Sequence, residues 1–186
     1  SEDGMTMDSE IDDWEDDGSG IEFETTQPDN EIWYISTDGK IVTPYKTDDF
    51  GANIVSNTYE NGKGVICFDS AITKIGNLAF FRCYTLSKIQ MPSSITEIGN
   101  QSFSYSGLES IYIPKSASDM GWLSFSPCSK LRYVSGKYAT SDNRALIVNN
   151  EIIAFARVGL SSFTVPEEVE IIGQGVFSGC SDLVEI

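Results

Sequence analysis

The residues best spaced for chemistry lie in an acidic stretch near the start of the chain. Four carboxylates follow the ligand spacing of a helix-flanked calcium loop, and they are Asp13, Glu15, Asp17 and Glu24. Such a loop usually carries a branched apolar residue at its eighth position, where this chain has Gly20. The neighbouring residues also show no helical pattern. We therefore interpret the match as accidental and predict no metal site.

Nucleophilic chemistry lacks its usual partner, because the chain contains no histidine to act as a general base. The four cysteines are spaced too widely for a zinc site or a thioredoxin-type motif, and they are Cys67, Cys83, Cys128 and Cys180. The last three share one position of the repeat described below, which predicts interior thiols without disulfide bonds. Cys67 is predicted to face outward, and we do not expect it to be a catalytic nucleophile.

Paired carboxylates could serve glycoside hydrolysis if they faced each other across a cleft. Glu167, Glu168 and Glu170 follow Pro166 on a predicted return turn, so we interpret them as solvated side chains. The chain is therefore predicted to be non-enzymatic and to bind no cofactor.

The net charge of −16 is concentrated at the start of the chain. Residues 1–31 hold thirteen acidic residues and no lysine or arginine, which leaves fifteen acidic and twelve basic residues, a net of −3, in the rest. Residues 1–22 are predicted to form an acidic disordered tether. Nucleic acid is not an expected partner without a basic stripe. Direct membrane insertion is not expected either, since no apolar run reaches the roughly 20 residues of a membrane helix.

Four copies of one pattern follow from residue 73 onward. The glycines of the pattern are Gly76, Gly99, Gly121 and Gly173. Its phenylalanines are Phe80, Phe103, Phe125 and Phe177. Both series are spaced by 23, 22 and 52 residues, with leucine and isoleucine or valine columns in the same register. Stacked copies bury these columns together, which predicts a β-rich leucine-rich-repeat solenoid, a short right-handed coil with one short strand per repeat.

Three hairpins complete the predicted fold. The first two hairpins span residues 23–64 and the strand at 65–68. We expect them to cap the repeats, which occupy residues 65–186. The first joins 32–35 to 41–43, and the second joins 53–55 to 65–68 across an Asn-Gly turn. The third is the insertion at about 136–161, in which 144–148 pairs with 151–155 and which accounts for the spacing of 52.

The repeat resembles the BspA-like class of bacterial leucine-rich repeats. Residues 86–103 follow its motif from Leu86 through Pro92 to Phe103, and the resemblance covers about 31–186. Ser106 departs from it at a position where cysteine is usual. The resemblance implies an extracellular or cell-surface protein, an outer-membrane lipoprotein in many members. If this lipoprotein habit of the family applies, a lipidated cysteine would lie just before Ser1.

Outward-facing strand residues are the candidate binding surface, because residues flanking a buried strand position face the concave side. One predicted row is Cys67, Gln90, Tyr112 and Ser135. A second is Val65, Lys88, Ser110 and Tyr133. Six of these residues form the candidate site, and they are Lys88, Gln90, Ser110, Tyr112, Tyr133 and Ser135.

We therefore predict a binding or adhesion module whose concave face meets a protein or glycan ligand. The alternative is a structural spacer or assembly module of a surface lipoprotein, and a glycan-active enzyme is the least favoured interpretation. We expect a monomer or weak end-to-end association, because Ile186 stands within a strand pattern whose edge is open.

Overall fold

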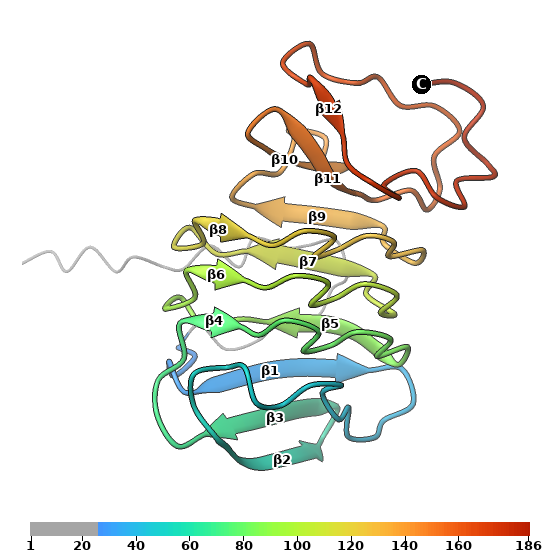
Figure 1. Cartoon of the computed structure of the whole chain (residues 1–186). Coiled ribbons are helices and arrows are strands. Elements are labelled where there is room, and N and C mark those ends of the chain that lie inside the picture. Colours follow the sequence, from blue (N-terminus) through green and yellow to red (C-terminus); the bar gives the residue numbers. More distant parts are fainter. Residues whose placement is uncertain (1–25) are drawn as a thin grey trace, which may run out of the picture.

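The computed structural model describes residues 26–186, which form a column of short strands without a helix (Figure 1). The acidic calcium-loop match and the predicted tether lie outside these residues. The strands of the described part are β1 (Glu31–Ser36), β2 (Ile54–Glu60), β3 (Lys63–Phe68), β4 (Lys74–Ile75), β5 (Leu86–Gln90), β6 (Glu97–Ile98), β7 (Ser110–Ile113), β8 (Asp119–Met120), β9 (Tyr133–Gly136), β10 (Ala145–Val148), β11 (Glu151–Phe155) and β12 (Ile171–Ile172).

Each repeat contributes two strands rather than one, which corrects the prediction of a single strand per repeat. The two-residue strands β4, β6 and β8 form one parallel ladder, and β7 and β9 form another on the opposite side (Figure 1). Strand β5 lies beside β7, with the Glu109 amide donating to the Ser87 carbonyl (2.9 Å). The short ladder escaped prediction because two residues leave no period to recognise.

A column of stacked phenylalanine rings fills the interior between the two ladders. Phe80, Phe103 and Phe125 are each at most 1% exposed, and successive rings lie 5.4 and 5.2 Å apart with interplanar angles of 7° and 5°. Phe50 continues the column toward the start of the chain, with its ring 6.2 Å from that of Phe80. The predicted phenylalanine register is therefore confirmed for the first three repeats, because equivalent side chains stack directly on one another.

The glycines of the repeat permit the coils to approach. A Cβ on Gly99 would lie 2.7 Å from the Asn77 nitrogen, and one on Gly121 would lie 2.4 Å from the Asn100 nitrogen. Both contacts are with backbone atoms of the preceding coil, which cannot move aside as a flexible side chain can. Only glycine leaves room there.

A ladder of side-chain hydrogen bonds runs beside these glycines. The Asn77 amide donates to Asp49 Oδ2 (2.8 Å), the Asn100 amide to Asn77 Oδ1 (2.7 Å), and the Trp122 amide to Asn100 Oδ1 (2.7 Å). Lys74 donates to Asp49 Oδ1 at 2.7 Å, and this bond, assisted by the Asn77 amide, lowers the pKa of the Asp49 carboxyl. Asp49 therefore begins a series that asparagines continue from coil to coil.

The first strand is placed differently from the prediction. Strand β1 pairs antiparallel with β3 on one side and with β5 on the other, so the predicted hairpin between 32–35 and 41–43 is wrong. Residues 41–43 form no strand, because both edges of β1 are already occupied. The pairing predicted across Asn61-Gly62 is present between β2 and β3, giving a sheet in the order β2-β3-β1-β5.

Residues 137–172 combine a hairpin with the contacts of a repeat. Strands β10 and β11 pair antiparallel across Asn149-Asn150. The amides of Glu170 and Ile171 both donate to the Asn150 carbonyl, as those of Thr96 and Glu97 donate to Thr73. Strand β12 then pairs parallel with β11. The predicted phenylalanine column does not continue here, because the Phe177 ring packs against Phe155 (4.9 Å) in a second hydrophobic cluster.

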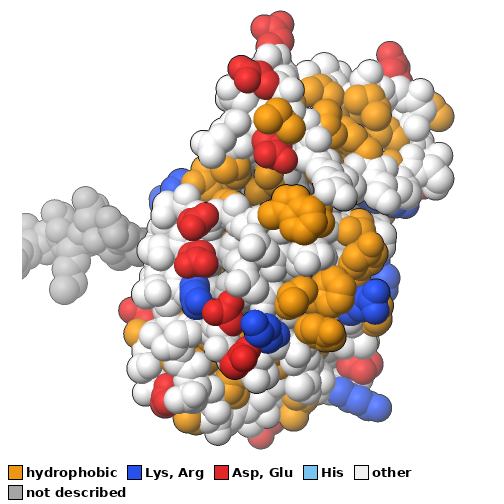
Figure 2. Space-filling model, viewed as in Figure 1, with side chains coloured by type: hydrophobic (Ala, Val, Ile, Leu, Met, Phe, Trp, Pro, Cys, Tyr) orange, Lys and Arg blue, Asp and Glu red, His pale blue; other side chains and the backbone are white. Residues whose placement is uncertain are grey.

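Aromatic side chains are exposed on the outer side of the coils, beyond the β4-β6-β8 ladder. Tyr45, Tyr84, Tyr105 and Trp122 are 49–63% exposed. The ring of Phe81 joins Tyr45 (5.3 Å) to Tyr105 (5.9 Å). Figure 2 shows hydrophobic side chains gathered beside basic ones on this face. We refer to these residues as the lateral aromatic cluster.

The close approach at Gly99 gives a test of the stacked-coil geometry. Gly99→Ala should lower the free energy of unfolding by about 1–3 kcal/mol, because the added Cβ meets backbone atoms. Ser93→Ala, at an exposed position of the same repeat, should change it by less than about 0.5 kcal/mol. Urea unfolding followed by tryptophan fluorescence measures both variants, and equal stabilities would contradict the geometry.

Candidate concave binding site

Strand pairing aligns four residues of the predicted rows on β7 and β9, at one end of the concave face. Strands β7 and β9 pair Ser110 with Tyr133 and Tyr112 with Ser135. The intervening residues Ile111 and Val134 are at most 1% exposed, so their neighbours in sequence occupy the opposite face. Strict alternation along these strands explains why sequence spacing alone located both pairs.

The rows do not continue to Cys67 and Val65 as predicted. Strand β1 lies between β3 and β5, so Trp33 stands opposite both Val65 and Gln90. Because β1 runs antiparallel to its neighbours and lies 50 residues or more before β5, the repeat spacing gave no sign of it. Trp33 was therefore missed as a concave residue.

The six candidate residues differ in exposure. Lys88, Gln90 and Ser110 are buried, at 3%, 4% and 4% exposed. Tyr112, Tyr133 and Ser135 are half-buried. The end of the sheet at β7 and β9 is therefore the accessible part of the predicted site.

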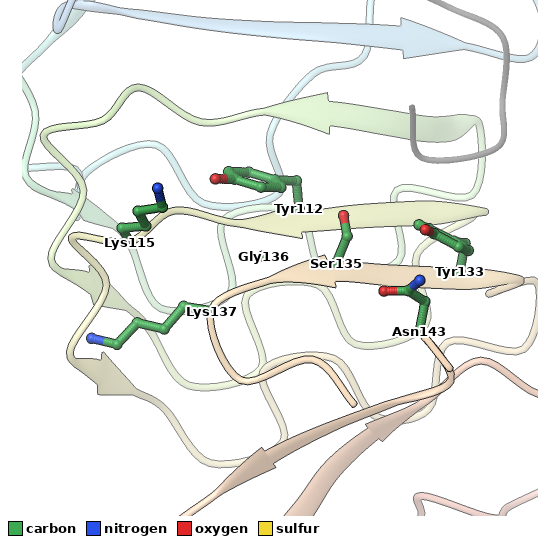
Figure 3. Close-up of a pocket in the computed structure, with 7 residues that line it drawn as sticks. All are labelled: Tyr112, Lys115, Tyr133, Ser135, Gly136, Lys137 and Asn143. Atoms are coloured by element: carbon green, nitrogen blue, oxygen red, sulfur yellow. The ribbon is translucent and has the colours of Figure 1, made fainter. Parts of the chain in front are cut away.

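A cleft of about 500 Å³ lies over β7 and β9. It is lined by Tyr112, Lys115, Tyr133, Ser135, Gly136, Lys137 and Asn143. Figure 3 shows Tyr133 and Asn143 at one end of the cleft and the two lysines at the other, with Ser135 between them. The structure thus brings together three of the six predicted residues and adds polar and basic groups from the segments that follow each strand.

The added residues come from turns that the repeat pattern does not cover. Lys115 follows β7 and is exposed. Lys137 follows β9, where its ammonium donates to the Ala117 carbonyl. The Asn143 carbonyl accepts the Val134 amide (2.9 Å), which fixes the insertion against the edge of β9. In the sequence, only the two lysines and the break in the repeat after β9 indicated that these turn residues join the cleft.

The other end of the concave face is organised around Trp33. Its ring faces the Lys63 ammonium, which lies 3.2 Å from the ring centroid. Its indole nitrogen donates to Glu31 Oε2 (2.6 Å). The other Glu31 oxygen accepts a weak bond from the Cys67 thiol (3.8 Å). The side chains at this end of the face are therefore held in place by contacts with one another.

All four cysteines are free thiols in the structure. Burial raises the pKa of the Cys83 thiol to about 11 and that of Cys128 to about 12. The Cys128 thiol donates to the Phe103 carbonyl (3.2 Å) and lies 3.7 Å from Ser106 Oγ, the serine that replaces cysteine in the preceding coil. Cys67 is half-buried on the concave face, which makes it the accessible thiol of this sheet.

The remaining chemical candidates show no assembled centre. Glu167, Glu168 and Glu170 are exposed, as the solvated-turn interpretation requires. Among residues 26–186, no three carboxylate, cysteine or histidine side chains are arranged to hold a metal ion. The same residues also contain no helix able to cross a membrane.

Comparison with known proteins identifies the repeat. The sequence model of the BspA type leucine rich repeat region matches residues 52–184 in six copies, two more than the four that we aligned. The chain belongs to this family. The resemblance drawn from the repeat motif is therefore confirmed, and the matched range includes the β2–β3 hairpin and the insertion. No curated protein matches the chain.

Two solved structures of leucine-rich-repeat proteins match part of this chain. A leucine rich cell surface protein from Faecalibacterium prausnitzii A2-165 is 24% identical with a TM-score of 0.55, over 62% of this chain and 35% of that protein. A leucine-rich repeat protein from Bacteroides ovatus ATCC 8483 is 22% identical with a TM-score of 0.40, over 60% and 39%. This leucine-rich-repeat chain spans less than two fifths of the length of either protein.

Thiol chemistry tests the burial pattern of the repeat. At pH 8, Cys67 should react with a maleimide at least about tenfold faster than Cys83 or Cys128, because burial keeps the latter two protonated and out of reach. Peptide mass spectrometry over a time course measures the order of labelling, and labelling in urea gives the four-thiol reference. Equal rates for Cys67 and Cys128 in the folded chain would contradict the structure.

Proposed function

We propose that this chain is a non-enzymatic binding module that uses the cleft over β7 and β9 to contact a protein or glycan. The observation that carries the proposal is the cleft itself, in which Tyr112 and Tyr133 stand half-buried beside lysine, serine and asparagine side chains. Tyrosine supplies a large amphipathic contact area with few rotatable bonds, which makes it common at binding hot spots.

The composition of the cleft supports binding over catalysis. Its described lining residues include no carboxylate, whereas glycoside hydrolysis uses two carboxyl groups across the scissile bond. The buried thiols have raised pKa values and no histidine to activate them. A glycan-active enzyme is therefore not favoured.

We infer a location at the cell surface from the family and its relatives. The solved protein from F. prausnitzii is described as a cell surface protein, which supports the same location for this chain. Lipid attachment just before Ser1 remains the expectation from the family resemblance. In that arrangement, the acidic N-terminal segment would separate the repeats from the membrane.

Substitution of the two tyrosines tests the proposal. After a glycan array and a panel of extracellular-matrix proteins have identified a ligand, Tyr112→Ala and Tyr133→Ala should each weaken its binding by tenfold or more. Biolayer interferometry measures the affinities. Tyr84→Ala, in the lateral aromatic cluster, is the matched control and should leave binding unchanged. If Tyr84→Ala weakens the binding of the ligand and neither cleft substitution does, the ligand binds the lateral aromatic cluster and the proposal for the cleft is wrong.

A structural spacer is the second candidate, and a specific observation favours it. Strand β12 stands at one edge of the sheet β10-β11-β12, with Ile171 and Ile172 52% and 45% exposed. We infer that β1–β3 close the other end of the solenoid. An apolar strand edge is a template for pairing with another chain.

End-to-end association has a direct test in sedimentation. If β12 mediates assembly, the chain should associate at high concentration and Ile171→Lys should abolish the effect, because the charge blocks edge pairing. Analytical ultracentrifugation over a hundredfold concentration range measures this, with Glu170→Lys as the exposed neighbouring control. A monomer at every concentration would rule out assembly through this edge.

A further inference from the structure

A second pocket, of about 300 Å³, lies within the lateral aromatic cluster. It forms where residues 41–45 cross the turn at residues 81–85 of the first coil. The Tyr45 amide donates to the Ala79 carbonyl (2.7 Å), and the Cys83 thiol donates to the Thr43 carbonyl (3.6 Å). These bonds hold the two segments together, so the pocket is preformed, as small-molecule sites usually are.

Apolar and aromatic side chains form the walls of this pocket and are accessible. Ile41, Tyr45 and Tyr84 are 49%, 63% and 62% exposed. The Phe81 ring meets the Tyr45 ring edge-on, with 5.3 Å between the centroids. Figure 2 shows the hydrophobic side chains gathered on this face. Apolar side chains that are exposed together mark interaction sites more often than those exposed singly.

Arg82 carries the single charge among the described residues that line the pocket. Its guanidinium carbon lies 5.1 Å from the centroid of the Phe81 ring and 5.9 Å from that of Tyr105 in the next coil, so cation–π contacts hold it in place. The two ion pairs found within residues 26–186 both join a lysine to an aspartate. The guanidinium therefore has no carboxylate partner in this part of the chain.

A guanidinium beside aromatic rings matches a sugar that carries a carboxylate. The planar guanidinium donates two parallel hydrogen bonds to a carboxylate. Aromatic rings offer their electron-rich faces to the C–H groups on one side of a pyranose ring. Thr43 and Thr85 add hydroxyl groups to the lining, and the volume is at the small end of the range for ligand sites, which suits one sugar ring.

An acidic peptide matches this pocket less well. Its carboxylates stand on flexible stems, which lose rotamer freedom on binding, and it presents no rigid apolar face to the rings. A sugar acid has its carboxylate and its C–H face on one rigid ring, so both contacts form together. The combination of Arg82 with Tyr45 and Tyr84 therefore favours a sugar over a peptide.

We propose that this pocket is a second binding site, separate from the cleft over β7 and β9, and that it binds a uronic acid residue of a polysaccharide. The uronate carboxylate pairs with Arg82, and its pyranose ring lies against Tyr45 and Tyr84. Tyr105 is 49% exposed and its ring meets that of Phe81 at 5.9 Å, so the aromatic surface continues into the next coil. That continuity provides a contact for the neighbouring sugar and favours an internal residue over a terminal one.

Two ligands that differ in charge test the site on the unmodified chain. A galacturonic acid tetrasaccharide and its fully methyl-esterified form have the same rings, but only the acid carries carboxylates. Isothermal titration calorimetry should give at least about tenfold tighter binding of the acid, because the ester loses the charge-assisted bonds to Arg82. Equal affinities, or no binding of the acid at millimolar concentration, would overturn the proposal.

Two further probes distinguish other occupants of the same pocket. Tetraglutamate supplies carboxylates without pyranose rings, and sialyllactose supplies an acidic sugar at the end of a glycan. Each should bind at least about tenfold more weakly than the galacturonic acid tetrasaccharide. Binding of tetraglutamate as tight as that of the tetrasaccharide would make the pocket a peptide site, and tighter binding of sialyllactose would make it a site for terminal sugars. Either result would replace the proposed ligand.

The backbone of the turn allows the guanidinium to be removed without new strain. φ is 56° at Arg82 and 72° at Gly179, which stands at the equivalent position, two residues after the phenylalanine of the last repeat. Glycine adopts this left-handed conformation readily. Arg82→Gly should therefore keep its melting temperature within about 4 °C of the natural value, while its affinity for the tetrasaccharide falls at least about tenfold. Unchanged affinity would contradict the role of Arg82.

Matched variants separate this site from the cleft of the proposed function. Tyr84→Ala should weaken binding of the tetrasaccharide, and Tyr112→Ala, in the cleft, should leave it unchanged. Arg132→Gln, at an exposed position outside the pocket, should also leave it unchanged, which controls for the loss of a positive charge. Loss of tetrasaccharide binding in Tyr112→Ala but not in Arg82→Gly would place the sugar in the cleft. That result would overturn the second site and support the proposed function.

Discussion

The direct stacking of one coil on the next is the constraint on which the rest of the structure depends. Neighbouring strands must lie about 4.8 Å apart for their amides and carbonyls to bond, so equivalent residues in successive coils touch. The Phe103 ring consequently meets the Phe80 and Phe125 rings at 5.4 and 5.2 Å, and a Cβ on Gly99 would meet the backbone beneath it. Each position of the repeat therefore tolerates only side chains that pack against the equivalent residue of the neighbouring coil.

This constraint explains how much of the fold could be predicted from the sequence. Equivalent residues of successive coils contact one another, so they recur in the sequence at a fixed spacing. The glycine positions, the phenylalanine positions and the pairing of Tyr112 with Ser135 could therefore be predicted from the sequence alone. Strand β1 was misplaced because it packs antiparallel to the repeats and obeys no spacing. The lysines of the cleft were missed for a similar reason, since Lys115 and Lys137 lie in turns where the strand alternation has ended.

Exposure was harder to predict than direction. Lys88 on β5 and Tyr133 on β9 are separated by β7 and face the same side, yet Lys88 is 3% exposed and Tyr133 is half-buried. A strand period reports which face a side chain occupies and carries no information about what else packs on that face. The lateral aromatic cluster was missed because turn residues such as Tyr105 and Trp122 vary from copy to copy and belong to no column.

The insertion shows which parts of a repeat the architecture needs. After the insertion, Phe177 follows Gly173 by four residues as in the other repeats, but its ring packs against Phe155 in a second hydrophobic cluster. The backbone contacts were nevertheless retained, since Asn150 accepts the same pair of amide bonds that Thr73 accepts, and Gly173 donates to Ile152 as Gly99 donates to Ile75. Backbone hydrogen bonds do not specify side chains, so a coil can exchange its core while preserving the ladder. The segment after β9 contributes Asn143 to the cleft, while its strands β10, β11 and β12 form a sheet separate from the β4-β6-β8 and β7-β9 ladders.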